Sequence, residues 1–200
     1  MRLTAENKAM LRSKVLDGAA RALRRDGYAV ANLDRIMAEA DLTRGAFYAH
    51  FSSKDAVFEA VLAERHPLLD RLKARDGVKA SALRDEMLQI FGDYLTPGNL
   101  DAVFMGCTVA SLAGDAARRE AVRPGFEAGR NAILEEMARG QKAVDTQVLS
   151  AALSLANGAL TTARAMATAE AAADVLTSAN AAFGVLIATA IPNQTQERAT

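Results

Sequence analysis

The stretch Thr43-Arg-Gly-Ala-Phe-Tyr-Ala-His-Phe-Ser-Ser-Lys54 gathers three aromatic side chains, two cationic groups, a histidine and a glycine in one short segment. The whole chain contains only seven Phe, three Tyr and no Trp, so this concentration calls for an explanation. Thr43 is a suitable N-cap, and we expect a short helix over residues 44–50 after a tight connection. Phe47 and Phe51 are four residues apart, so they share one face of that helix and should anchor it in a core.

The segments before this stretch also have helical spacing. Residues 5–25 read as a helix that Asp26-Gly27 ends, and Asn32 is a good N-cap for a second helix over residues 33–40. Two short helices joined by a tight connection have the proportions of a helix-turn-helix, whose second helix enters the major groove of DNA. The basic residues support this interpretation, because residues 1–54 carry 10 Lys or Arg and 6 Asp or Glu in a chain of formal net charge zero.

The polar residues of the stretch then take distinct roles. Thr43 and Arg44 would face base edges, because Arg can bond guanine in a bidentate way and Thr offers a hydroxyl and a methyl group. Gly45 lets the backbone approach the DNA closely, whereas Tyr48 and Lys54 suit contacts to phosphate. The segment thus predicts a division between two phenylalanines that pack and polar groups that bind DNA.

The rest of the chain predicts an all-α fold of about nine helices. Ser52-Ser-Lys-Asp55 resembles a capping box that opens a long helix to Arg75, kinked at Pro67. Pro192 should begin a polar, frayed tail over residues 192–200. Further helices are expected over about 79–95, 100–113, 117–139 (interrupted at Pro124-Gly125), 143–168 and 170–191.

The stretch and its neighbours also resemble a known family. GYAVAN and LDRIMAEADLTRGAFYAHFSSKDAVFEAVL are similar to the DNA-binding region of the TetR family of bacterial repressors, over roughly residues 8–62. The resemblance implies a helix-turn-helix domain (1–54) and a helical regulatory and dimerisation domain (55–191). Carried over by position, it implies DNA-facing or phosphate-facing sites at the following residues: Asn32, Thr43, Arg44, Tyr48, His50 and Lys54.

The last two helices contain 17 Ala in residues 143–191 and only four charged side chains. So few charges cannot solvate two whole helices, and a broad apolar face needs a partner. One interpretation is a four-helix homodimer interface made from two copies of the pair, and the other is burial of both helices within one subunit. The resemblance favours the dimer, and a two-fold dimer would match a palindromic operator.

A small-molecule inducer is expected from the resemblance, in a pocket of the second domain. Aromatic residues, Met and Cys could line it, although any protein core uses the same residue types. Few charged groups are expected to point inward, so the ligand should be apolar or aromatic. The candidate lining residues are Phe91, Tyr94, Phe104, Met105, Cys107 and Phe126.

The lone Cys107 excludes an intramolecular disulfide and leaves open a thiol that senses electrophiles or oxidants. No signal peptide and no uninterrupted apolar run of spanning length is present, so a soluble cytoplasmic protein without a membrane partner is expected. His50 and His66 do not have metal-ligand spacing, and no nucleophile or nucleotide-binding motif occurs. We therefore expect a DNA-binding repressor, not an enzyme, with no cofactor and no metal; the alternative is a helical protein-interaction module that does not bind DNA.

Overall fold

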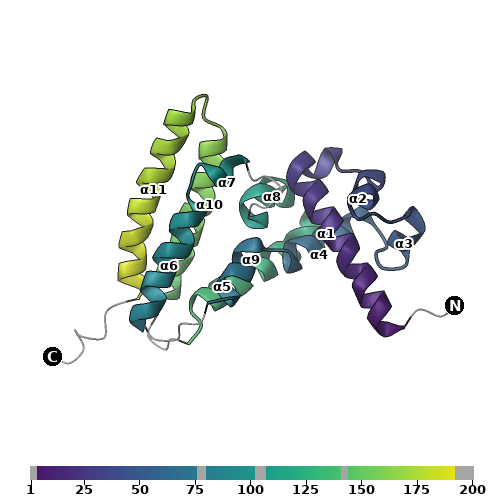
Figure 1. Ribbon diagram of the computed structural model, residues 1–200, viewed down its shortest axis with the longest axis horizontal. Coiled ribbons are helices and arrows are strands. Elements are labelled where there is room, and N and C mark those ends of the chain that lie inside the picture. Colours follow the sequence, from purple (N-terminus) through teal and green to yellow (C-terminus); the bar gives the residue numbers. More distant parts are fainter. Residues whose placement is uncertain (1–3, 76–79, 102–106, 141–143, 192–200) are drawn as a thin grey trace. The chain divides into compact units, whose positions relative to one another are not determined.

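The protein is described by a computed structural model that covers residues 4–75, 80–101, 107–140 and 144–191, and these residues confirm the all-α fold (Figure 1). They form no strand, and their helices replace the expected nine with a larger number of shorter elements. The helices are α1 (Ala5–Val30), α2 (Leu33–Glu39), α3 (Arg44–Tyr48), α4 (Lys54–Glu64), α5 (Pro67–Lys73), α6 (Ala80–Tyr94), α7 (Gly98–Asp101), α8 (Thr108–Ala117), the 3-10 helix η1 (Glu120–Val122), α9 (Arg123–Met137), α10 (Thr146–Arg164) and α11 (Ala169–Ala190).

The chain packs into two compact units, and each is assembled from separate parts of the sequence. The first unit comprises Met1–His66 and Val103–Arg130, and the second comprises Pro67–Ala102 and Asn131–Thr200. These units are defined by packing. The functional boundary expected between residues 54 and 55 therefore stays a prediction.

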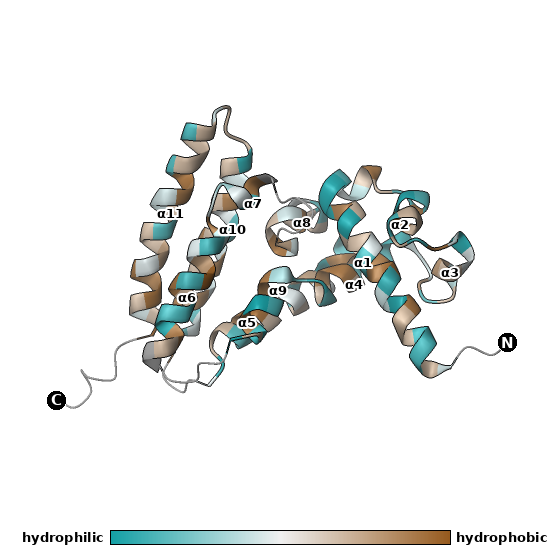
Figure 2. Ribbon diagram, in the orientation of Figure 1, coloured by the Kyte–Doolittle hydropathy of each residue, from teal (hydrophilic) through white to brown (hydrophobic). Residues whose placement is uncertain are grey.

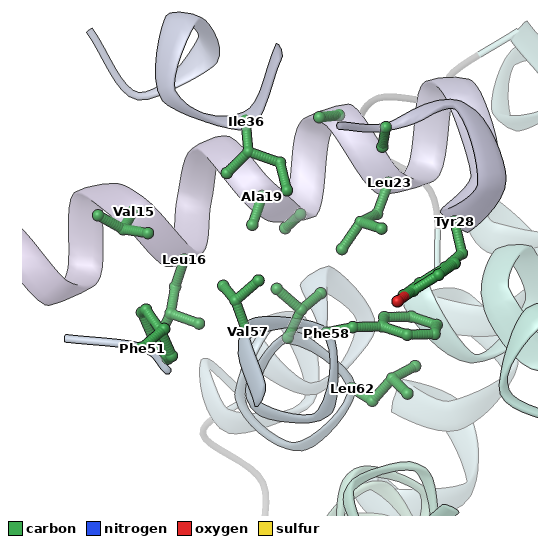
Figure 3. Close-up of a cluster of buried hydrophobic side chains, with 14 of the residues drawn as sticks. Val15, Leu16, Ala19, Leu23, Tyr28, Ile36, Phe51, Val57, Phe58 and Leu62 are labelled. Atoms are coloured by element: carbon green, nitrogen blue, oxygen red, sulfur yellow. The ribbon is translucent and has the colours of Figure 1, made fainter. Parts of the chain in front are cut away.

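The first unit is organised around α1, which packs against α2, α4 and α8. Apolar residues of α1 recur at helical spacing and point into the core together with Phe58 and Leu62 of α4 (Figure 3). Helices α1, α2 and α4 each begin after an N-cap residue whose side chain accepts a hydrogen bond from a backbone N–H group of the first turn. These N-caps are Thr4, Asn32 and Ser53. Gly27, at φ 72°, interrupts α1 near its end, as the sequence predicted.

Close helix contacts in this unit depend on glycine. A Cβ atom at Gly18 of α1 would lie 2.7 Å from the backbone nitrogen of Ala40 and 2.8 Å from the carbonyl oxygen of Ile36. A Cβ atom at Gly129 of α9 would overlap the carbonyl oxygen of Leu62 and the imidazole of His66. The first contact places the end of α2 directly on α1, and the second places the middle of α9 on the end of α4.

The second unit is built on α10 and α11, which pack along their lengths, with α6 beside them (Figure 1). Phe91 of α6 stacks on Phe183 of α11 with 4.2 Å between ring centroids, and both side chains are fully buried. The hydroxyl of Tyr94 donates a hydrogen bond of 2.9 Å to the side-chain oxygen of Asn157 on α10. These contacts fix α6 against the helix pair.

Two expected helices are divided differently in the structure. The helix expected from Ser52 to Arg75 is not one kinked helix, because α4 ends at Glu64 and α5 begins at Pro67. The residue before a proline, here His66, is disfavoured in the helical region, and the chain leaves that region one residue earlier, at Arg65, with φ −119° and ψ 82°. The chain therefore breaks before the proline.

The interruption expected at Pro124-Gly125 is also wrong. Pro124 lies in the first turn of α9, where its missing N–H group costs nothing. The helix expected over 100–113 is replaced by α7 and α8, and residues 102–106 between them lie outside the described part of the chain.

The exposed side of α11 is a mixture of small, apolar and uncharged polar residues beyond Asp174, and its colours in Figure 2 are correspondingly mixed. Val185 keeps 68% of its surface accessible, and no charged residue follows Asp174 within this helix. By length and composition alone, α11 would suffice to cross a membrane. Such a face requires a covering surface of some kind.

Candidate DNA-binding interface

The connection between α2 and α3 is a tight turn. Asp41 has a φ of 52°, a left-handed conformation that Asp tolerates better than most side chains. The N–H of Leu42 donates a 3.0 Å hydrogen bond back to the carbonyl of Met37, which closes the turn. Helices α2 and α3 thus have the short, angled connection of a helix-turn-helix.

The two sides of α3 have opposite chemical character. Phe47 and Phe51 are 1% and 7% exposed and belong to the core of the first unit, which confirms their expected packing role. Thr43, Arg44 and Gly45 at the start of the helix are exposed. Tyr48 is 65% exposed, and its ring forms a T-shaped pair with Phe47 at a centroid distance of 5.4 Å. A row of polar groups therefore lies at the surface of a helix that two phenylalanines fix.

Thr43 begins α3, but its hydroxyl accepts no capping hydrogen bond, in contrast to Asn32 and Ser53. Its side chain is exposed, so the hydroxyl remains available to a partner. Asn32 is also exposed and uses its side-chain oxygen to cap α2 at 3.0 Å from the N–H of Arg35.

Arg44 forms an ion pair with Asp34 of α2, with 2.8 Å between Nε and Oδ1. Both side chains are more than 60% exposed, so the pair contributes little stability in water. Its geometric effect is greater, because the carboxylate of one helix orients the guanidinium at the start of the next.

His50 lies half-buried at the end of α3. Burial lowers the pKa of its imidazole below 6.5, and the positive charges of Lys8 and Arg12 on α1 lower it further. The guanidinium of Arg12 lies 5.4 Å from the ring centroid of Phe51 and donates a hydrogen bond of 2.8 Å to Glu64. Lys8, Arg12 and His50 thus form a basic group beside the expected reading helix.

Lys54 is placed differently from the exposed residues. Its side chain is half-buried, and its ammonium donates a hydrogen bond to the backbone carbonyl of Tyr28. Burial lowers the pKa of this ammonium, and the nearby charge of Arg119 adds to the effect. A contact from Lys54 to phosphate stays a prediction, since the group already has an intramolecular partner.

The structure also shows ionic contacts that the sequence did not predict. Asp26 bonds Arg25 at 2.7 Å and Arg35 of α2 at 3.0 Å, and these hydrogen bonds lower the pKa of its carboxyl group to about 2. Asp115 and Arg119, far along the chain, contact Tyr28. The resemblance contained the Gly27-Tyr28 pair, but no local pattern marks its distant partners.

The same segment matches a known family. A model of the bacterial regulatory proteins of the tetR family matches residues 15–61.

Residues 15–61 belong to the TetR family.

A curated relative of this TetR-family region is the HTH-type transcriptional regulator SrpR of Pseudomonas putida. It is 43% identical over 68 residues, which are 34% of this chain and 32% of SrpR. The chain therefore aligns with only about a third of that relative.

Solved structures match the fold over most of this chain, including residues outside the TetR-family region. The reduced form of NemR from E. coli has a TM-score of 0.65 and 19% identity, and the match covers 87% of this chain and 95% of NemR. The multidrug binding protein EbrR, complexed with imidazole, has a TM-score of 0.56 and 24% identity, and covers 84% of this chain and 93% of EbrR. At these identities the similarity establishes the all-helical fold.

The residues expected to line a ligand pocket fall into both packing units. Phe91 and Tyr94 are buried in the second unit. Cys107 is buried in the first unit, where Phe126 packs against the hydrophobic core. Phe104 and Met105 lie outside the described residues, so the pocket stays a prediction.

A groove of about 600 Å³ lies instead on the second unit, between α10 and α11. It is open to the surface and none of the six candidate pocket residues lines it. Its walls are small and mostly apolar: Leu155, Gly158, Ala159, Thr162, Asp174, Val175, Ser178, Ala179 and Ala182.

Proposed function

We propose that this protein is a sequence-specific, DNA-binding transcriptional repressor of the TetR type that acts as a homodimer on a palindromic operator. The supporting observation is the two-sided character of α3. Phe47 and Phe51 fix the helix in the core, while Thr43, Arg44 and Tyr48 are exposed on it. A helix held in this way presents hydrogen-bonding groups to base edges and phosphates, and the helix itself does not have to become ordered on binding. Asn32, Gly45, His50 and Lys54 complete the proposed interface.

The homodimer is proposed to form through α10 and α11. Their groove is lined mainly by small residues, which let a second helix pair approach closely. Val185 and the uncharged part of α11 would be covered in the same interface. Two copies related by a two-fold axis would present their α3 helices about 34–36 Å apart, one turn of B-DNA. This assignment explains the apolar surface of α11 without a membrane, and it supports a soluble cytoplasmic protein.

We further propose that a small apolar or aromatic ligand releases the repressor from its operator. EbrR, which has a similar fold, is described as a multidrug binding protein and has been seen with imidazole and with proflavin. The aromatic core of the second unit, with Phe91 against Phe183, offers walls suited to such molecules. The ligand would act by stabilising a form of the dimer that does not fit the operator.

Selection of duplexes from a random DNA pool by the purified protein, at near-physiological salt, tests the proposal. A recovered palindrome whose half-sites are one helical turn apart is the expected result. Retention of duplexes without any enriched sequence, and with steep loss on added salt, would leave only electrostatic binding and contradict a specific reader. Absence of any binding would favour a helical protein-interaction module.

A thiol-sensing repressor is a second candidate, favoured by the position of Cys107. This residue directly precedes α8. Its electrostatic interaction with the half-buried guanidinium of Arg24 is one of the effects on the pKa of that guanidinium. Helix N-termini and neighbouring cations both favour thiolates in proteins, whereas the 1% exposure of Cys107 hinders attack. Reaction of the native protein with a maleimide and concurrent loss of operator binding would support this candidate. An inert thiol would exclude it.

A further inference from the structure

A group of five residues in the first unit joins the helix-turn-helix to α8 and the segment that follows it. We call it the Tyr28 cluster, and it consists of Tyr28, Lys54, Asp55, Asp115 and Arg119. Only Lys54 belongs to the proposed DNA interface. Asp115 lies in α8 and Arg119 directly precedes η1, so both are far from α3 in the sequence.

The backbone N–H and carbonyl groups of Tyr28 both form hydrogen bonds with side chains from elsewhere in the chain. Its N–H donates a 2.9 Å hydrogen bond to the carboxylate of Asp115, and its carbonyl oxygen accepts one from the ammonium of Lys54. The preceding Gly27 is outside the helical conformation, so the hydrogen-bond ladder of α1 does not fix the backbone at Tyr28. We call this stretch of backbone the corner. Its backbone is positioned by α8 on one side and by the first residue of α4 on the other.

The ring of Tyr28 is held as firmly as its backbone. The guanidinium of Arg119 lies 3.5 Å from the ring centroid and the ammonium of Lys54 lies 4.1 Å from it. The hydroxyl donates a 2.5 Å hydrogen bond to Asp55, and Arg119 approaches the same carboxylate at 3.8 Å. Burial and Asp55 raise the pKa of this hydroxyl to about 12, so it remains a neutral donor at physiological pH.

The corner controls the entry to α2. Tyr28 lies only a few residues before Asn32, the N-cap of α2, and the carboxylate of Asp34 on α2 orients Arg44. A shift of the corner would therefore move the first turn of α2 and the guanidinium that is proposed to read a base. Lys54 would shift with it, because its ammonium is bonded to the corner.

We propose that Asp115 and Arg119 are positioning residues for DNA binding, which act by fixing Tyr28 at the entry to α2. The inference rests on the proposed function, since it concerns the affinity of the helix-turn-helix for duplex DNA. Neither residue needs to touch DNA, so their removal should weaken binding without changing the number of phosphates contacted.

The test compares single variants of the full-length protein, with the duplex that the wild-type protein selects from a random pool as the probe. Arg119→Met removes the cation over the ring, and Arg118→Met is the matched control. Arg118 has the same charge and adjacent position, but it donates to the carbonyl of Gly114 within α8. Any effect of net charge alone is thus common to both variants. Arg119→Lys restores a cation and should rescue binding.

The expected result for Arg119→Met is an affinity about three- to ten-fold below that of the wild-type protein, with an unchanged slope of log affinity against log salt. Arg118→Met and Arg119→Lys should both stay within about two-fold of the wild type. Amide hydrogen exchange of the free protein should become faster at residues 28–34 in Arg119→Met only. Because Arg119 is 39% exposed, we expect its replacement to leave the fold intact.

Asp115 provides a second, independent pair of variants. Asp115→Ala removes the acceptor of the Tyr28 N–H and should weaken binding as Arg119→Met does, whereas Asp115→Asn keeps an acceptor oxygen and should bind nearly as the wild type. Equal affinity of Arg119→Met and Arg118→Met, with unchanged exchange at residues 28–34, overturns the inference while the proposed function stands. A wild-type protein that selects no duplex overturns the proposed function and this inference together.

Discussion

Arg75 and Arg139 each hold the backbone of the other. The guanidinium of Arg75 donates a 3.2 Å hydrogen bond to the carbonyl of Arg139, and the guanidinium of Arg139 donates a 2.8 Å bond to the carbonyl of Arg75. Arg75 also donates a 2.6 Å bond to the carbonyl of Glu136 near the end of α9. The end of α9 with the turn after it and the segment after α5 are therefore joined through side-chain hydrogen bonds to backbone carbonyl groups.

Arg75→Met tests this arrangement. The Arg75 side chain is only 2% exposed, and its loss removes the donor to the carbonyls of Glu136 and Arg139 and the cation 3.9 Å from Glu86. We expect the free energy of unfolding to fall by about 2–3 kcal/mol in urea denaturation. Arg71→Met is the control, because its ion pair with Asp93 is exposed and should contribute under about 1 kcal/mol. Equal losses in the two variants would contradict the assigned role.

Gly129→Ala should destabilise the first unit. The new methyl group would overlap the carbonyl of Leu62 and the buried imidazole of His66, so α9 would have to move away from α4. We expect a loss of about 1–3 kcal/mol in the free energy of unfolding. Gly92→Ala in α6 meets no atom closer than 4.0 Å and should gain up to about 1 kcal/mol from helix propensity. Thermal unfolding of both variants checks the opposite signs, and a neutral Gly129→Ala would refute the close approach.

Arg44→Ala should remove specificity more than affinity. The guanidinium is exposed at the start of α3, where a bidentate contact to a guanine discriminates by about 1–3 kcal/mol. Fluorescence anisotropy with the selected duplex should show roughly ten- to hundred-fold weaker binding. A random-sequence duplex is the internal control and should change much less, because it is held by phosphate contacts. A uniform loss on both duplexes would instead assign Arg44 to the backbone.

Binding should depend on the protonation of His50. Because burial, Lys8 and Arg12 lower its pKa in the folded protein, the unfolded chain binds this proton more tightly. The contribution of neutral His50 to stability is therefore lost as the pH falls through 6.5 towards the folded pKa. A DNA phosphate beside His50 would reverse the preference and favour the protonated form. Operator affinity should then rise between about pH 8 and about pH 6 in the wild type and stay level in His50→Gln. Parallel profiles would exclude a phosphate contact at His50.

Val185→Glu should dissociate the homodimer. The side chain is 68% exposed on α11, and a charge there would have to be buried at the proposed interface. Sedimentation equilibrium should give a dimer for the wild type and a monomer for the variant. Met10→Glu, another exposed apolar position at 51%, lies in α1 and should remain dimeric. A wild-type monomer that binds lipid vesicles would show that a membrane covers α11 instead.

Local sequence patterns correctly predicted those features of the fold that depend on a single helix. The four-residue spacing of Phe47 and Phe51 predicted their burial, and the position of Asn32 predicted the start of α2. The break before Pro67 follows an equally local rule, the restriction on residues that precede proline, but the sequence interpretation allowed a kink instead.

The partners of Lys54 and Arg75 were beyond such patterns. Lys54 was predicted to face phosphate, yet its ammonium bonds the carbonyl of Tyr28, which only the tertiary packing brings near. Arg75 served in the sequence only as the expected end of a helix, and its hydrogen bonds go to the distant carbonyls of Glu136 and Arg139. Long side chains select partners from the whole fold, so their roles do not follow from spacing along one helix.

The first packing unit is not formed by one continuous stretch of sequence, since it combines Met1–His66 with Val103–Arg130. A single crossover after α4 would discard Asp115 and Arg119 together with Leu112 and Val122, and would uncover the core residues of α1 and α4 that share their cluster. A functional chimera would need two inserted pieces, with one junction inside the continuous helix α9. Recombination during evolution faces the same constraint, so exchange of the whole first unit requires more than one crossover.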